Sequence, residues 1–301
     1  MHPILLATLI GISRTVVFAE VAGIAVLLIG LLALKDDFLR ARSLDKIVVL
    51  AYLFCAMPMA TFGGEHLSGD KGIIGLVPKF MPWAVFWAYF VGFAWVAASL
   101  SWATKILVRW SGLLFGIAMF LFVAMMDLRG TLRNPHNRFI WALMLRELSF
   151  GGGGWLLAAS AMRDEHGQGR KILFTVGRLL LGITAVFYGV QHFLHPLNVP
   201  GVPLERLMPT WMPRTLISYL TGAILFVAGA GILRAKKTRV AATYLGTWIF
   251  LLALFVYGPI LVVALMDPSP AEKLEGINYF EDTLLYAGVI LALANASPQE
   301  T

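Results

Sequence analysis

The stretch TVVFAEVAGIAVLLIGLLAL at residues 15–34 determines the class of protein to which this chain belongs. Its twenty residues include one charge, Glu20, and an α-helix needs about 20 mostly apolar residues to cross a bilayer. The stretch is too long for the core of a signal peptide and has no basic start. We therefore expect a membrane helix that is retained.

Eight further segments of the same kind follow this one. Their apolar runs are long and do not alternate with a period of two, so they predict helices and not strands. The expected spans are residues 47–64, 83–101, 108–127, 139–161, 173–192, 214–233, 240–266 and 278–296. The sequence thus predicts an all-α polytopic membrane protein with about nine transmembrane helices.

The composition of the whole chain agrees with this class. Of 301 residues, 59% are hydrophobic and 14% are charged, and the mean hydropathy is +0.78. Soluble domains contain about 45–50% apolar and about 25% charged residues, so soluble, fibrous and disordered proteins are excluded. The single cysteine, Cys55, excludes a disulfide within the chain, a CxxC pair and a cysteine zinc site.

Basic residues are distributed unevenly between the two sets of loops. One set, at residues 35–46, 105–109, 163–171 and 234–239, carries 13 Lys and Arg, and the other set, which includes Arg206, carries 9. Cytoplasmic loops are enriched in Lys and Arg, so we expect the N-terminus outside and the C-terminus inside the cytoplasmic membrane. The net charge of +7 then reflects membrane topology, and nucleic acid is not expected as a partner.

Two parts of the chain resemble each other. FGGEH at 62–66 matches YGVQH at 188–192, and LVPKFMP at 76–82 matches LMPTWMP at 207–213. RELSFGGGGWLLA at 146–158 matches FEDTLLYAGVILA at 280–292, and the order of the matches never changes.

We interpret this order as a duplication of a four-helix unit. The predicted parts are an anchor helix with its linker at residues 1–43, a first unit at 44–162 and a second unit at 172–297. Because four is even, both units enter the membrane from the same side. We therefore expect two tandem four-helix bundles related by a pseudo-two-fold axis along the membrane normal.

The second unit resembles the DoxX-like family of membrane proteins. The resemblance rests on GRLLLG at 177–182, YGVQHFLHP at 188–196, WMP at 211–213 and NYFEDTLLYAGVILALA at 278–294. The first unit departs from it where Tyr52 stands opposite Arg178. The resemblance implies a four-helix unit and, for some members, a link to membrane oxidoreductases that reduce quinone or act on thiols.

Polar residues of the spans collect near the expected outer face. A quinone site needs an aromatic wall, hydrogen-bond donors for the carbonyl oxygens and a group that carries protons. The candidate catalytic residues are Glu65, His66, Glu147 and His192. The candidate ligand-binding residues are Trp83, Trp87, Arg146, Tyr188, Gln191, Trp211 and Glu281.

Several other readings of these residues stay open. In the simplest of them, Arg146 forms a buried ion pair with Glu147 or with a carboxylate on a neighbouring helix, and His66 and His192 only cap helices. His192 and His195 with Glu65 are a weak candidate zinc site, and His66 with His192 a weak candidate haem site. Gly151–Gly154 lie within a span, where glycine permits close helix packing.

The function hypothesis is a membrane subunit associated with a quinone-linked redox system, which receives electrons from a partner protein. No motif in the chain implies a bound cofactor, and whether the chain is an enzyme is left open. The alternatives are a non-catalytic assembly subunit of a larger membrane complex and a transporter of small molecules or ions. The expected partners are the lipid bilayer, other subunits and quinone.

Overall fold

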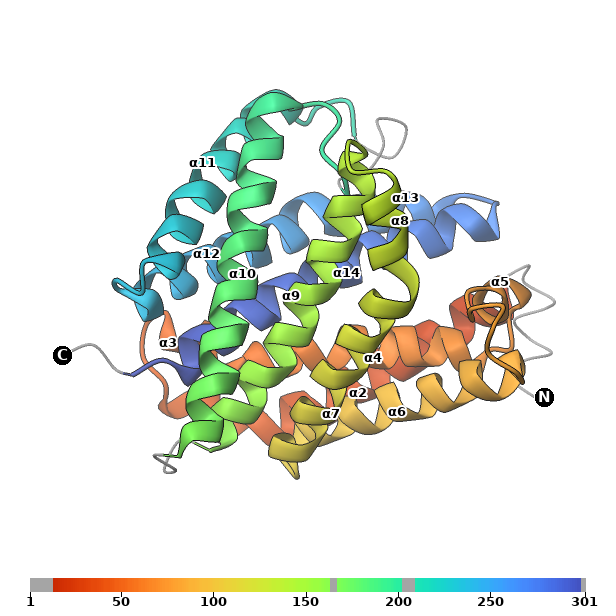
Figure 1. Cartoon of the computed structure of the whole chain (residues 1–301), viewed down its shortest axis with the longest axis horizontal. Helices are drawn as coiled ribbons and strands as arrows, with labels where there is room; N and C mark the ends of the chain where they lie inside the picture. The colour runs from red at the N-terminus through yellow and green to blue at the C-terminus, as the bar shows by residue number, and fades with distance from the viewer. Residues whose placement is uncertain (1–12, 163–166, 202–208, 299–301) are drawn as a thin grey trace.

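The computed structural model describes residues 13–162, 167–201 and 209–298. Arg163 and Arg206 from the charge count, and Leu207 and Met208 from the repeat, lie outside these residues. Within the described residues the regular elements are helices, and eight of them are long and apolar enough to cross a membrane. The protein is an all-α, multi-pass membrane protein (Figure 1).

The helices coincide with the nine expected spans. The elements are α2 (Arg14–Arg40), α3 (Asp45–Val49), α4 (Ala51–Leu67), α5 (Lys71–Gly75), α6 (Ala84–Thr104), α7 (Val108–Phe122), η1 (Val123–Asp127), α8 (Leu128–Arg133), α9 (Arg138–Ala161), α10 (Gln168–Leu194), α11 (Arg214–Leu233), α12 (Thr238–Leu252), η3 (Ala253–Tyr257), α13 (Gly258–Met266) and α14 (Pro270–Ala296). The elements η1 and η3 are π-helical segments inside longer helices.

Helix α9 forms as expected, but it is the one expected span that is not among the eight helices apolar enough to cross a membrane. It has 24 residues, but Arg146, Glu147 and four glycines lower its apolar character. Half of the helix is buried, because α7, α10 and α14 surround it. A helix enclosed by other helices does not need an apolar surface toward lipid.

The helix ends gather at two opposite faces of the molecule. The basic face, defined by the loops of Asp37, Lys105 and Arg239, holds the C-terminal ends of α2, α6, α9, α11 and α14 (Figure 1). Lys105 forms an ion pair with Asp37 (2.5 Å), and Arg239 forms one with Asp45 (2.6 Å). The ends that carry α5, α8 and α13 form the opposite face.

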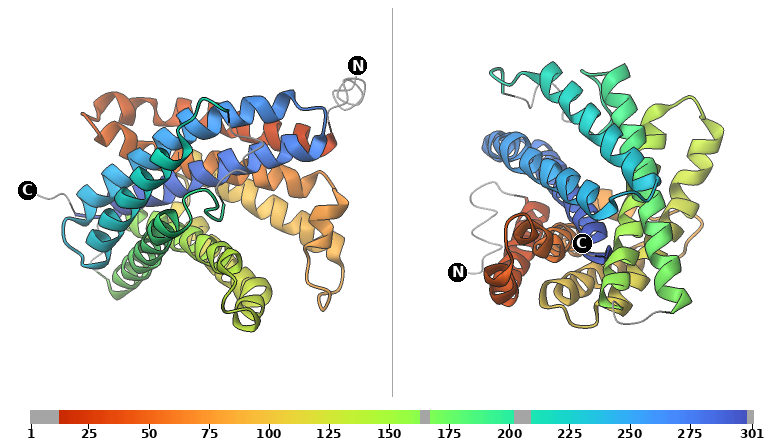
Figure 2. Two further views of the ribbon diagram at one scale, coloured as in Figure 1. Left: turned by 90° about the horizontal axis from the view of Figure 1, so that it is seen from above. Right: turned by 90° about the vertical axis from the view of Figure 1, so that its left-hand side faces the viewer.

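Several of the principal contacts between helices run across the boundary between the two expected units. Each unit splits into two hairpins, and α4–α6 of the first unit packs against α12–α14 of the second through α4 and α14. Likewise, α10–α11 of the second unit packs against α7–α9 of the first through α9 and α10. Figure 2 shows these two groups crossing, with the contact between α9 and α14 at the centre.

Backbone irregularities recur at matching positions in the two halves of the chain. The turns before α7 and α12 contain positive φ angles at Lys105 and Leu107 and at Ala235 and Lys237. The π-helical segments η1 and η3 follow α7 and α12. We keep the duplication as our interpretation of this recurrence.

Small residues allow the central helices to touch. A Cβ atom on Gly288 of α14 would lie 2.8 Å from the backbone nitrogen of Cys55 in α4. A Cβ atom on Gly153 of α9 would lie 2.1 Å from a methyl group of Val289 in α14. Close approach of this kind holds membrane helices together, because lipid tails are as apolar as the side chains.

We predict that Gly288→Ala destabilises the protein by about 1–3 kcal/mol, because the added methyl group meets backbone atoms of α4 that cannot rotate away. Unfolding in mixed micelles measures the change. Gly169→Ala is the matched control, since a Cβ atom there meets nothing within 4 Å. Equal stability of the two variants would contradict the packing described for α4 and α14.

Candidate ligand-binding cavity

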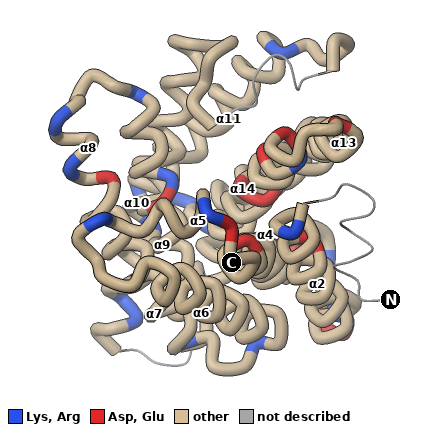
Figure 3. The backbone as a smooth tube through the Cα atoms, turned by 90° about the vertical axis from the view of Figure 1, so that its right-hand side faces the viewer, with Lys and Arg blue, Asp and Glu red and all other residues tan. Residues whose placement is uncertain are grey.

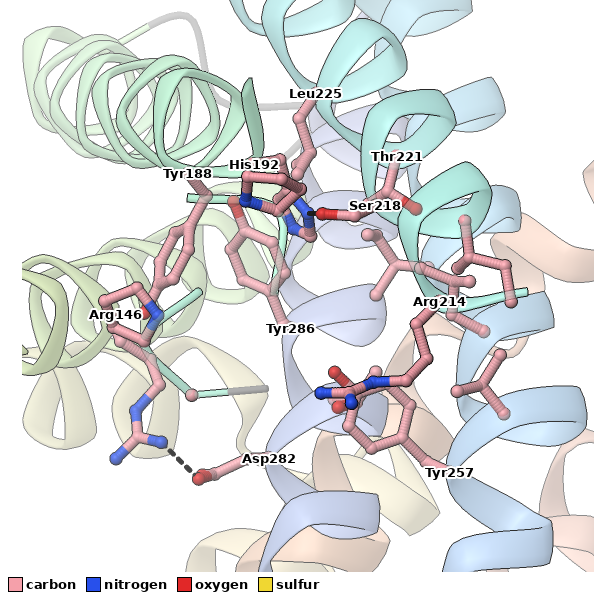
Figure 4. A pocket seen from close by; sticks show the side chains of 18 of the residues that line it. Arg146, Tyr188, His192, Arg214, Ser218, Thr221, Leu225, Tyr257, Asp282 and Tyr286 are labelled. Carbon is pink, nitrogen blue, oxygen red and sulfur yellow. Dashed lines mark hydrogen bonds and ion pairs between the residues drawn. The ribbon is translucent and has the colours of Figure 1, made fainter. Parts of the chain in front are cut away.

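A cavity of about 120 Å³ lies between α10, α11, α12–η3 and α14 (Figure 4). All four helices of the second half of the chain line it, and α9 of the first half adds Arg146. Three of the candidate residues, Arg146, Tyr188 and His192, are therefore brought together at one cavity.

His192 lies in the last turn of α10 and is 8% exposed. Its Nδ1 atom forms a hydrogen bond with the Ser218 hydroxyl of α11 (2.9 Å), which fixes the orientation of the ring. The second ring nitrogen, Nε2, takes no part in this hydrogen bond. The ring reaches the cavity because Gly222 of α11 lets the two helices approach at this point.

Arg146 projects from α9 and forms an ion pair with Asp282 of α14, which also lines the cavity (Figure 4). Its Nε atom is buried and has no hydrogen-bond partner among the described protein atoms. Of the two partners expected for Arg146, Glu147 or a carboxylate on a neighbouring helix, the structure shows the second, Asp282 of α14. The carboxyl group of Glu147 lies beside that of Asp127 in η1.

Tyrosine residues and hydroxyl groups form the rest of the polar surface. The Tyr188 hydroxyl donates to the carbonyl oxygen of Ala142 (3.1 Å), whereas the buried Tyr286 hydroxyl has no partner among the described protein atoms. Arg214 extends from the first turn of α11 toward Tyr257 (Figure 4).

Several lining residues escaped the sequence prediction: Arg214, Ser218, Thr221, Tyr257, Asp282, Thr283 and Tyr286. The sequence contains two features that could have identified some of these residues. Asp282 and Tyr286 are four residues apart, which places them on one side of a helix. Tyr257 directly precedes Gly258 and Pro259, which follow the π-helical segment.

Apolar side chains and a π-helical segment complete the wall. Leu225 of α11 and Ile249 and Leu252 of α12 face the cavity, together with Val256 and Tyr257 of η3. Single π-helical turns inside α-helices occur frequently at functional sites. The cavity therefore combines an apolar wall with a few polar groups, as ligand sites commonly do.

The expected tryptophan wall is not formed. Trp83 and Trp211 are 77% and 70% exposed, because they precede the first turns of α6 and α11 and lie at the opposite face. Trp87 packs against Phe86 and Phe90 on α6, away from the cavity. Aromatic residues at these positions are typical of the interface between membrane and water.

The remaining candidates also lie outside the cavity lining: Glu65, His66, Glu147, Gln191 and Glu281. His66 Nδ1 contacts the carbonyl oxygen of Phe62 (2.8 Å), and its ring packs edge-on against Trp95. Glu281 lies deeper than expected because α14 begins at Pro270 and not near residue 278, which places Glu281 about 16 Å along the helix.

The weak zinc site is not assembled. Helix α10 ends at Leu194, so His195 is its exposed C-cap residue and does not continue the helical face of His192. Among the described residues, no group of three or more His, Cys, Asp or Glu side chains is placed to hold a metal ion.

Comparisons with family models, with curated proteins and with solved structures each gave no match. The resemblance to the DoxX-like family stays a prediction from the quoted motifs.

We predict that Arg146→Gln destabilises the protein by about 3 kcal/mol, because it leaves the Asp282 carboxylate without its charged partner between packed helices. The double variant Arg146→Gln/Asp282→Asn should recover part of this loss, since it removes the unpaired charge. Unfolding in mixed micelles measures both.

Asp37→Asn is the control for this prediction, because its pair with Lys105 is exposed and contributes about 0–1 kcal/mol. An Arg146→Gln variant that is no less stable than the Asp37→Asn variant would show that the pair does not support the fold.

Proposed function

We propose that this membrane protein binds the head group of a quinone in the cavity of its second half. The observation that carries the proposal is the cavity itself, where Arg146, His192 and Tyr286 meet an apolar wall inside a helical membrane protein. The resemblance to DoxX-like proteins points in the same direction. In this proposal the basic face is cytoplasmic and the cavity lies toward the outside of the inner membrane.

The size of the cavity suits one ring. An apolar cavity of about 150 Å³ in a protein core takes up benzene, so a cavity of about 120 Å³ is on the scale of a single six-membered ring. A larger head group needs some outward movement of the lining side chains.

The polar groups that line the cavity can donate hydrogen bonds to the carbonyl oxygens of a quinone. The Tyr286 hydroxyl and Arg146 Nε are buried donors that lack a partner among the described protein atoms, and His192 lines the same cavity. Buried donors of this kind are normally satisfied. A quinone carbonyl oxygen accepts hydrogen bonds and supplies what these groups lack.

In the first half of the chain, the space beside His66 that corresponds to the cavity beside His192 is occupied by an aromatic ring. There the ring of Trp95 packs against His66 and Phe122, whereas Leu225 and Leu252 take the matching positions beside His192. Gly92 and Gly222 approach the Cβ atoms of His66 and His192 in the same way. The two histidines are thus equivalent in packing, and His192 borders the cavity described above, whereas His66 packs against Trp95.

We predict that His192→Ala weakens the binding of a short-chain benzoquinone about tenfold, because a buried hydrogen bond contributes about 1.4 kcal/mol or more to such a contact. Equilibrium binding to the purified protein in nanodiscs measures the change.

His66→Ala is the matched control and should bind the benzoquinone as the wild type does. Equal affinity of the two variants would contradict the cavity as the site. Absence of binding to the wild-type protein would favour the non-catalytic assembly subunit over a quinone site.

We predict that Leu225→Trp abolishes benzoquinone binding, because the larger ring takes the space that Trp95 takes in the first half. Leu225→Met preserves the volume and should bind normally. Full binding by Leu225→Trp, in protein whose helicity and monodispersity match the wild type, would place the quinone elsewhere.

A further inference from the structure

Two consecutive carboxyl groups of α14 face different neighbours. Asp282 pairs with Arg146 of α9 on the side of the cavity. Glu281 accepts a hydrogen bond from the Thr61 hydroxyl of α4 (3.3 Å) on the other side. The change of side follows from the 100° between successive residues of an α-helix.

The surroundings of Glu281 are acidic. Glu20 of α2, Glu65 of α4 and Asp282 of α14 itself are the charged groups that act on it electrostatically. Arg146, the cation that pairs with Asp282, lies on the side of α14 that faces the cavity. Figure 3, which looks onto the opposite face, shows acidic positions on α14 and beside α4 and α5.

Two carboxylate oxygens in this group have no partner among the described protein atoms. They are Glu65 Oε1 and Glu281 Oε2, and each side chain is only 4% exposed. An ionised carboxylate without a partner in an apolar region is very costly, so such groups take up a proton or a cation. The described acidic residues are not arranged as a metal-binding group.

We propose that Glu65 and Glu281 form a buried proton-binding site between α4 and α14. Protonation of one carboxylate forms one O–H bond, removes one negative charge and turns an unpartnered acceptor into a donor. The proton comes from water at the opposite face, and no other bond changes. This inference does not rest on the quinone proposal, because Glu65 and Glu281 do not line the cavity.

A line of hydroxyl groups leads from the opposite face toward this site. Exposed Asp70 accepts a hydrogen bond from the buried Thr15 hydroxyl (3.3 Å), and Ser68 Oγ lies 3.4 Å from Thr15 Oγ1. Ser68 also donates to the carbonyl oxygen of Glu65 (2.6 Å). Hydroxyl groups both donate and accept, so this line can carry a proton from Asp70 as far as Ser68, which lies one turn from the Glu65 side chain.

Infrared spectroscopy tests the proposal, because protonated and ionised carboxyl groups absorb at different frequencies. We expect wild-type protein at neutral pH to show a carboxylic acid band that Glu65→Gln/Glu281→Gln lacks. Each single variant should shift the band, because the remaining carboxyl group then has an amide as its neighbour in place of a second carboxyl group. The amides mimic protonated carboxyl groups in size and charge, so the variants should keep the helicity of the wild type.

Asp37→Asn is the control, because its carboxylate is exposed and paired with Lys105, and it should leave the band unchanged. Identical carboxylic acid bands in wild type and double variant would overturn the proposal. A wild-type Tm that rises when sodium replaces choline, but not in the double variant, would overturn it in favour of a bound cation.

Discussion

The contact of α14 with both α4 and α9 is the feature on which the other parts of the structure depend. In a bilayer, helices gain little from leaving their apolar surroundings, so they associate through close packing and internal hydrogen bonds. Gly288 brings α14 against the backbone of α4, and Gly153 makes room for Val289 on the side of α9. Because α14 reaches both helices, its carboxyl groups contact partners from distant parts of the chain.

The distribution of polar groups follows from this arrangement. Large apolar side chains cover the outer surfaces of α2, α6 and α11, where a bilayer would contact them. The polar groups of the spans lie instead between α4, α9, α10 and α14. Arg146 and Asp282 neutralise each other on one side of α14, whereas Glu65 and Glu281 on the other side have acidic neighbours. One helix thus separates a neutralised polar region from an acidic one.

The sequence predicted the helices well and the assembly of the site less well. Long apolar runs are a local property, so the spans were found, and only α9 is less apolar than a helix facing lipid. Which helices meet is not local, so the exchange of hairpins escaped prediction, and the sequence did not single out Asp282 among the possible partners of Arg146. The tryptophans were placed in the site because they are aromatic, but Trp83 and Trp211 precede the first turns of α6 and α11, which directs them to the membrane interface. Residues such as Ser218 and Thr221 lie in no quoted motif, and only the fold identifies them as part of the cavity.

The exchange of hairpins has a consequence for how the protein is made. Helix α4 is synthesised early, yet one of its principal neighbours, α14, is the last helix of the chain. During synthesis the first half must therefore wait in the membrane with one side of α4 and one side of α9 covered only by lipid or by an insertion factor. The polar groups on those surfaces, Glu65 and Arg146 among them, acquire their native surroundings only after α14 has been synthesised. Assembly is thus a late and concerted event, and a ribosome that stalls before residue 270 leaves an intermediate whose charged interior faces the bilayer.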